Sequence, residues 1–128
     1  MRLLLDTHAL IWFLAGDPKL SSRARAEIEV VDGVVLVSAV SAMEVLTKHR
    51  LGKLPEAEEL AQDFEAAVAQ HGFDGLPISI RHAQLAGSLR LIHKDPFDRL
   101  LIAQSLIEGL TLVSNETVFD QTGVNRLW

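Results

Sequence analysis

Cysteine is absent from the 128-residue sequence. Without thiols the chain cannot form disulfides, a zinc–thiolate site or an iron–sulfur cluster, and it has no thiolate nucleophile. No apolar run approaches the ~18 residues that a membrane-spanning helix needs. The three leucines before Asp6 are too few for the apolar region of a signal peptide. We therefore expect a cytoplasmic protein without a membrane segment.

Positive charge is also scarce. The sequence has 12 Lys and Arg against 17 Asp and Glu, which gives a formal net charge of −5. Proteins that bind polyanions by general electrostatic attraction are basic, so contact with nucleic acid would require a local patch or metal ions. With 48 % hydrophobic and 23 % charged residues, the composition is that of a globular protein and excludes disorder. The length predicts a single domain over residues 1–128.

Short apolar runs alternate with longer segments of helical pattern. The runs are apolar throughout, which is typical of strands covered on both faces. Asp95 followed by Pro96 predicts a helix start, and Gly109 predicts its end. Ser41 and Glu44 have the spacing of a capping box. The expected strands cover residues 3–5, 34–37, 76–78, 110–113 and 124–128, and the expected helices cover 23–30, 41–50, 56–70, 80–91 and 96–108.

This alternation predicts an α/β fold, a three-layer α/β/α arrangement around a central parallel sheet of four to five strands. In such a sheet ligands lie beyond the carboxyl ends of the strands. Polar residues from four segments are expected at that edge, and most are acids. They are Asp6, Glu44, Asp95, Asp98, Ser114, Asn115 and Glu116.

Each acid also has an ordinary structural interpretation. Asp6 and Asp95 could cap helices, and Glu44 could complete the capping box. Asp98 precedes a buried helical run, where a carboxylate needs a partner. Several carboxylates in one cleft repel each other, and a divalent cation removes that conflict. Oxygen ligands without cysteine favour Mg²⁺ or Mn²⁺ over zinc, and such ions allow an acidic cleft to bind a phosphodiester and activate water.

Five segments together resemble PIN-domain proteins. They are LLDTHAL at 4–10, SAME at 41–44, DPFDRLLIAQ at 95–104, LVSNETVF at 112–119 and the terminal LW. The chain is most similar to the VapC-type ribonuclease toxins of bacterial toxin–antitoxin pairs. The resemblance implies a Mg²⁺- or Mn²⁺-dependent endoribonuclease that cleaves RNA, forms a homodimer and is inhibited by a small cognate antitoxin whose apolar segment lies in a groove.

The resemblance places the family's first three acids on Asp6, Glu44 and Asp98, which are the expected metal ligands and catalytic residues. The fourth acid of the family follows the last long strand in a Thr-x-Asp pattern, and that position matches Asn115. Asn115 is expected to be a fourth catalytic residue, because an asparagine can coordinate through its carbonyl oxygen or position a water. It brings no charge, so one tightly held ion is expected. Glu116 would replace the missing acid only if its loop turned inward.

Two alternatives remain at this stage. A catalytically weak PIN-like binding module is favoured by Asn115 and opposed by the three retained acids. A Mg²⁺-binding receiver-type signalling domain would need paired acids after the first strand, an aspartate after the second and a late lysine. Here Ser38 follows Val37, and no lysine follows Lys94.

Several other residues carry expectations. For Arg99 we predict a structural ion pair rather than a contact with RNA phosphate. The basic stretches around Lys48 and around His93 and Lys94 could form phosphate-binding rims or simply solvated helix ends. The first helix carries more apolar surface than one buried stripe needs, so Trp12 is expected in the core or at a partner surface.

Overall fold

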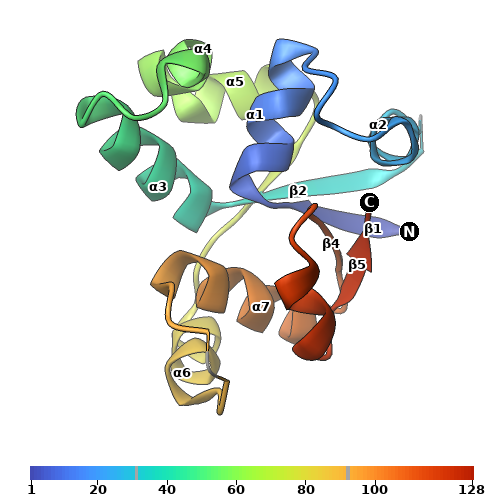
Figure 1. Ribbon diagram of the computed structural model, residues 1–128, viewed down its shortest axis with the longest axis vertical. Helices are drawn as coiled ribbons and strands as arrows, with labels where there is room; N and C mark the ends of the chain where they lie inside the picture. The colour runs from blue at the N-terminus through green and yellow to red at the C-terminus, as the bar shows by residue number, and fades with distance from the viewer. Residues whose placement is uncertain (31, 92) are drawn as a thin grey trace.

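The computed structural model describes residues 1–30, 32–91 and 93–128. Its strands are β1 (Arg2–Leu5), β2 (Val34–Ser38), β3 (Asp74–Leu76), β4 (Thr111–Val113) and β5 (Asn125–Leu127). Its helices are α1 (Thr7–Ala15), α2 (Ser22–Ile28), α3 (Ala39–Arg50), α4 (Glu58–Gln62), α5 (Phe64–Gln70), α6 (Ile80–Ser88) and α7 (Pro96–Glu108). Two 3₁₀ turns, η1 (Pro55–Ala57) and η2 (Thr117–Gln121), complete the elements (Figure 1).

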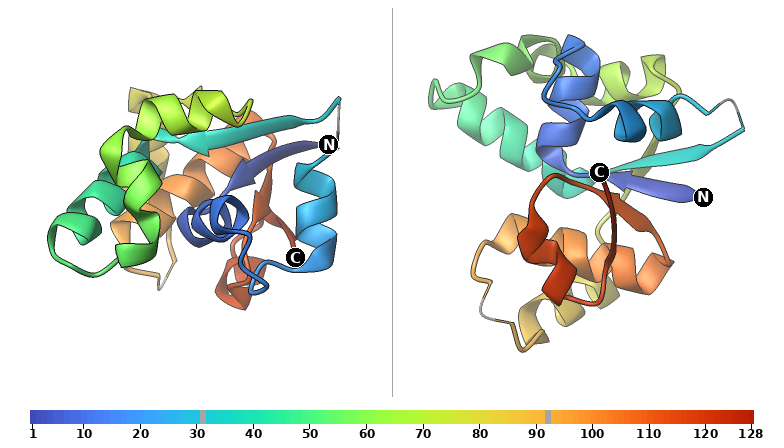
Figure 2. Two further views of the ribbon diagram at one scale, coloured as in Figure 1. Left: turned by 90° about the horizontal axis from the view of Figure 1, so that it is seen from above. Right: turned by 45° about the vertical axis from the view of Figure 1, so that its right-hand side comes forward.

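The strands form one parallel sheet in the order β3-β2-β1-β4-β5. Helices cover both of its faces (Figures 1 and 2). Leu3 and Leu5 of β1 belong to the core beneath α1, α2 and α5, whereas Leu4 belongs to the core beneath α7. This alternation explains why the strands are apolar throughout, and it confirms the predicted α/β/α fold. Within the described residues, no helix is long and apolar enough to cross a membrane.

The centre of the sheet sets the position of the acids. Strand β1 pairs with β2 on one side and β4 on the other, with Leu5 opposite both Val37 and Val113. All three strands run in the same direction, so the residues that follow them meet at one edge. Asp6, Ser38 and Ser114 lie at or just after these ends, as the sequence predicts for a ligand-binding edge.

The segment 56–70, predicted as one helix, is broken at Asp63. Asp63 has extended backbone angles, and its side chain accepts a hydrogen bond from the Ala66 N–H at 3.1 Å. The aspartate thus caps α5 and ends α4, because a short polar side chain can replace a helical hydrogen bond. Apolar periodicity continues across the break, so the prediction of a single helix was wrong.

Helix α3 begins directly after β2 rather than at Ser41. Ser38 is its N-cap and accepts a hydrogen bond from the Val40 N–H at 3.1 Å. Ser41 and Glu44 therefore lie inside the helix, and the predicted capping box is wrong. Both side chains are buried. Their polar groups face the start of α1, where they contact Thr7.

Candidate active site

Asp6 is the most buried of the predicted site acids, with 6 % of its surface exposed. It is the N-cap of α1, and its Oδ1 accepts a hydrogen bond from the Ala9 N–H at 2.7 Å. Burial raises the pKa of Asp6 to about 7, against the opposing effect of hydrogen bonds from Ser114 and Ala9, and the charges of Glu116 and Asp98 raise the pKa further. Among the described residues no basic side chain forms an ion pair with Asp6. A buried carboxyl in this state lacks a compensating cation.

Glu44 is buried on α3 and both of its carboxylate oxygens have partners. Its Oε1 accepts a hydrogen bond from the Thr7 hydroxyl at 2.5 Å, and its Oε2 accepts one from Lys48 Nζ at 2.6 Å. The Thr7 hydroxyl also lies 3.1 Å from that of Ser41. Since Thr7 directly follows Asp6, this contact connects Glu44 to the end of the central strand.

Asp98 lies in the first turn of α7. Asp95 caps this helix by accepting hydrogen bonds from the Phe97 and Asp98 N–H groups at 2.8 and 3.2 Å. His93 Nε2 lies 2.8 Å from Asp98 Oδ2. Burial is the main cause that raises the pKa of Asp98, and the charges of Asp95 and Glu116 act in the same direction, while His93 opposes them. Asp95 is therefore a helix cap, and Asp98 contacts His93 while its charge acts on Asp6.

The loop after β4 contributes Glu116. Ser114 is fully buried, and its Oγ accepts a hydrogen bond from the Glu116 N–H at 3.1 Å. Asn115 and Glu116 are both exposed. The charge of Glu116 nevertheless acts on both Asp6 and Asp98. A hydroxyl at 114 and an acid at 116 form the pattern Ser-x-Glu, and this spacing is the signal that could have identified Glu116 in place of Asn115.

The charges of Glu116 and Asp98 act on Asp6, but the predicted ligands are not assembled around a common point. The described residues contain no group of three or more His, Cys, Asp or Glu side chains arranged to hold a metal ion. Glu44 is engaged by Lys48 and Asp98 by His93, so two of the predicted ligands point to other partners. The donor chemistry still fits Mg²⁺ or Mn²⁺, because the donors are carboxylate oxygens and buried Asp6 lacks a cation.

Arg99 forms no ion pair within the described residues, so that prediction was wrong. Its guanidinium donates instead to four backbone carbonyl groups at the end of α6 and in the following segment, of which the Leu91 carbonyl is the most distant at 3.5 Å. The three shorter contacts are to Ala86 at 2.9 Å, Leu89 at 2.6 Å and His93 at 2.7 Å. The planar guanidinium carries several N–H donors, so it can satisfy several backbone carbonyl groups at once without a carboxylate partner.

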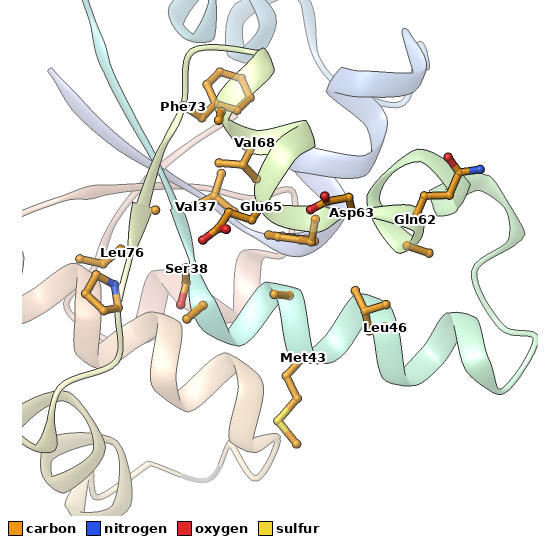
Figure 3. A pocket seen from close by; sticks show the side chains of 17 residues that line it. Val37, Ser38, Met43, Leu46, Gln62, Asp63, Glu65, Val68, Phe73 and Leu76 are labelled. Carbon is orange, nitrogen blue, oxygen red and sulfur yellow. The ribbon is translucent and has the colours of Figure 1, made fainter.

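An apolar groove of about 750 Å³ lies between α3, α5 and β3 (Figure 3). Met43, Leu46, Val68, Phe73 and Leu76 line it, and Met43 is 65 % exposed. Gln62, Asp63 and Glu65 supply its polar groups. Asp6, Glu44 and Asp98 are not among its lining residues. The groove is thus an apolar surface separate from the acids.

The PIN domain family matches this sequence over residues 3–125. The chain belongs to the PIN domain family. A comparison with curated proteins gives no match.

Solved structures that resemble this PIN domain include the following three, one of which is a toxin–antitoxin complex. One chain of VapBC2 from Rickettsia felis, bound to a DNA fragment from its promoter, has a TM-score of 0.72 and 17 % identity, covering 99 % of this chain and 98 % of that one. FitAcB from Neisseria gonorrhoeae has a TM-score of 0.70 and 21 % identity, covering 98 % of this chain and 96 % of that one. A toxin–antitoxin complex from Klebsiella pneumoniae has a TM-score of 0.63 and 22 % identity, covering 90 % of this chain and 87 % of that one. At these identities the likeness establishes the fold.

Proposed function

We propose that this PIN domain is a Mg²⁺- or Mn²⁺-dependent endoribonuclease and the toxin of a toxin–antitoxin pair. The observation that carries the proposal is Asp6, a buried carboxyl without an ion-pair partner in the described structure, with its pKa raised to about 7 beside Asp98 and Glu116. Clustered and buried carboxylates of this kind are typical of functional sites, where a bound cation stabilises their charged forms. The PIN fold and its likeness to solved toxin–antitoxin assemblies support the same function.

Asp6, Glu44 and Asp98 are the proposed metal ligands, and Glu116 takes the fourth position that was expected at Asn115. A bound divalent ion would neutralise these carboxylates, attract the RNA phosphodiester and lower the pKa of water. The surrounding residues orient the ligands. Thr7 holds Glu44, and His93 holds Asp98. Such contacts to ligand carboxylates generally set metal affinity.

A cleavage assay with single-stranded RNA tests the proposal. The purified protein should cleave RNA with Mn²⁺ and not with EDTA. Asp6→Asn and Asp98→Asn should each lower the rate by about a hundredfold or more, since each removes a charge that holds the ion. Asp120→Asn is the matched control, because Asp120 is exposed and pairs with Arg126. Full activity in folded Asp6→Asn would contradict the mechanism.

A binding module without cleavage is the second candidate, favoured by the absence of an assembled ligand group among the described residues. Such a module would bind RNA equally well in EDTA and in Mn²⁺ and would release no fragments. The receiver-type alternative is set aside, because the chain is a PIN domain.

We further propose that the partner is a small antitoxin and that the toxin forms a homodimer. An arginine or lysine of the antitoxin would block the site by pairing with Asp6 and Asp98. Two apolar surfaces are candidates for its apolar segment and for the dimer contact. One surrounds Trp12 on α1, and the other is the groove beside Met43.

A further inference from the structure

Glu44 has two contacts of different character. The Thr7 hydroxyl at 2.5 Å belongs to a residue that is 4 % exposed. Lys48 Nζ at 2.6 Å ends a side chain that is 34 % exposed. The first contact is therefore fixed inside the protein, whereas the second is made from the surface by a long and flexible stem.

The charge of Lys48 also interacts with the start of α7. The hydrogen bond to Glu44 is the main cause that raises the pKa of Lys48, and the charges of Asp95 and Asp98 add to it. Helices α3 and α7 pack against each other, so the ammonium group lies in the field of acids from two elements. Within the described structure it is the only lysine or arginine group paired with a proposed metal ligand.

An ammonium group and a divalent ion compete for the same carboxylate. Two cations at adjacent oxygens repel each other strongly in a partly buried cleft, where screening by water is weak. Substrate RNA brings a negative phosphodiester to the same place. The lysine stem allows the ammonium group to leave Glu44 and pair with that phosphodiester, while Thr7 keeps Glu44 in position.

We propose that Lys48 exchanges partners, so that its ammonium group neutralises Glu44 in the metal-free protein and binds a non-bridging phosphate oxygen of RNA in the loaded protein. Lys48 is then a substrate-binding residue that also sets the metal affinity of the site. This inference rests on the proposed ribonuclease function. It starts from the observation that both carboxylate oxygens of Glu44, a proposed ligand, have partners within the protein.

The first half of the exchange is the release of Glu44 by Lys48 when metal binds. It is tested by calorimetric titration of the metal-free protein with Mn²⁺ in the absence of RNA. Lys48→Met and Lys48→Gln should bind Mn²⁺ about tenfold more tightly, because Glu44 Oε2 is freed from a charge-assisted hydrogen bond. Lys48→Arg keeps the charge and should resemble the unaltered protein. Lys19→Met is the control, since it removes the same charge from a lysine placed over the Trp12 ring.

Steady-state cleavage of single-stranded RNA at saturating Mn²⁺ tests the second half. Lys48→Met and Lys48→Gln should raise the KM about tenfold, and Lys19→Met should not. Unchanged or weaker Mn²⁺ binding in both folded Lys48 variants would overturn the exchange, as would an unchanged KM. An unaltered protein that neither binds Mn²⁺ nor cleaves RNA would refute the proposed function itself, which separates the two failures.

Discussion

At the residue scale, Asp6 experiences opposing influences. Its hydrogen bond from Ala9 and its place at the positive end of α1 favour the carboxylate, whereas burial and the charges of Glu116 and Asp98 favour the acid. The outcome is a pKa of about 7 instead of 3.8. The proton on this carboxyl is thus coupled both to folding and to any cation that binds.

We predict that Asp6 makes the metal-free protein less stable as the pH rises. Between about pH 4 and pH 7 the folded chain holds a proton on Asp6 that the unfolded chain has lost, so the free energy of unfolding falls as pH rises through this range. The slope from this one group is at most about 1.4 kcal/mol per pH unit. Urea unfolding in EDTA at several pH values measures it.

Asp6→Asn isolates the contribution of this carboxyl, because asparagine caps a helix nearly as well as aspartate. The variant should be more stable than the unaltered protein in EDTA, and the difference should grow from about pH 5 to about pH 7.5. Mn²⁺ should reverse the order, since it stabilises only the protein that binds it. Parallel stability curves for the two proteins in EDTA would show that Asp6 titrates normally.

Single substitutions also test whether Asn115 or Glu116 is the fourth metal ligand. We predict that Glu116→Gln weakens Mn²⁺ binding about tenfold, because it removes a charge that acts on Asp6 and Asp98. Asn115→Ala should change it less than about twofold. If Asn115 were the fourth ligand, Asn115→Asp would tighten binding and Glu116→Gln would leave it unchanged, and calorimetry distinguishes these cases.

At the element scale, the connection between α6 and α7 depends on Arg99. Its three shortest hydrogen bonds reach the Ala86, Leu89 and His93 carbonyls, and His93 in turn contacts Asp98. Arg99 thereby ties the end of one helix to the residue that orients a proposed ligand on the next. Helix α6 ends at Ser88, before residue 91 where a helix was predicted to end.

We predict that Arg99→Met destabilises the protein by about 2 kcal/mol, because the partly buried carbonyl groups lose charged donors. Arg99→Lys should restore only part of the loss, since a single ammonium cannot reproduce the planar fork. The midpoint of urea unfolding, measured in EDTA, reports both effects. An unchanged midpoint in Arg99→Met would mean that solvent replaces the guanidinium without cost.

Elements whose cause is local were predictable from the sequence. Strands β1, β2 and β4 were predicted because they are apolar throughout, and the ends of α7 were predicted from Asp95 and Gly109. The break at Asp63 and the early start of α3 escaped prediction, because each depends on a side chain that bonds its own backbone. The partners of Lys48 and Arg99 depend on tertiary packing, which spacing along the chain does not encode.

At the scale of the whole molecule, the apolar groove and the surface around Trp12 are the two candidate partner surfaces. The Trp12 ring lies 5.9 Å from that of Trp128 and packs on the core, whereas Met43 is largely exposed. Substitution of Trp12 therefore changes both the stability of the protein and its surface. Substitution of Met43 changes mainly the surface, so the two residues give a matched comparison.

We predict that Met43→Glu weakens the proposed homodimer or the proposed antitoxin complex while leaving the melting temperature unchanged, because burying a charge against an apolar partner is unfavourable. Met43→Leu should assemble normally. Trp12→Ala should lower the melting temperature, and any additional loss of assembly would assign its surface to an interface. Sedimentation of the protein alone and after co-expression with the proposed antitoxin measures assembly, and thermal unfolding measures the melting temperature. Normal assembly of Met43→Glu would exclude the groove.

The central place of β1 in the sheet has a consequence for biosynthesis. Strand β1, which Asp6 follows, is translated before the other four strands of the sheet, but one of its two neighbours is β4, which includes Val113. Glu116 follows β4, and the long separation between these partners delays closure of the sheet. A nascent chain that has not yet released residues 111–116 from the ribosome cannot bring Glu116 to Asp6. The proposed nuclease site therefore assembles late in synthesis, after the ribosome has translated almost all of the residues that build the domain.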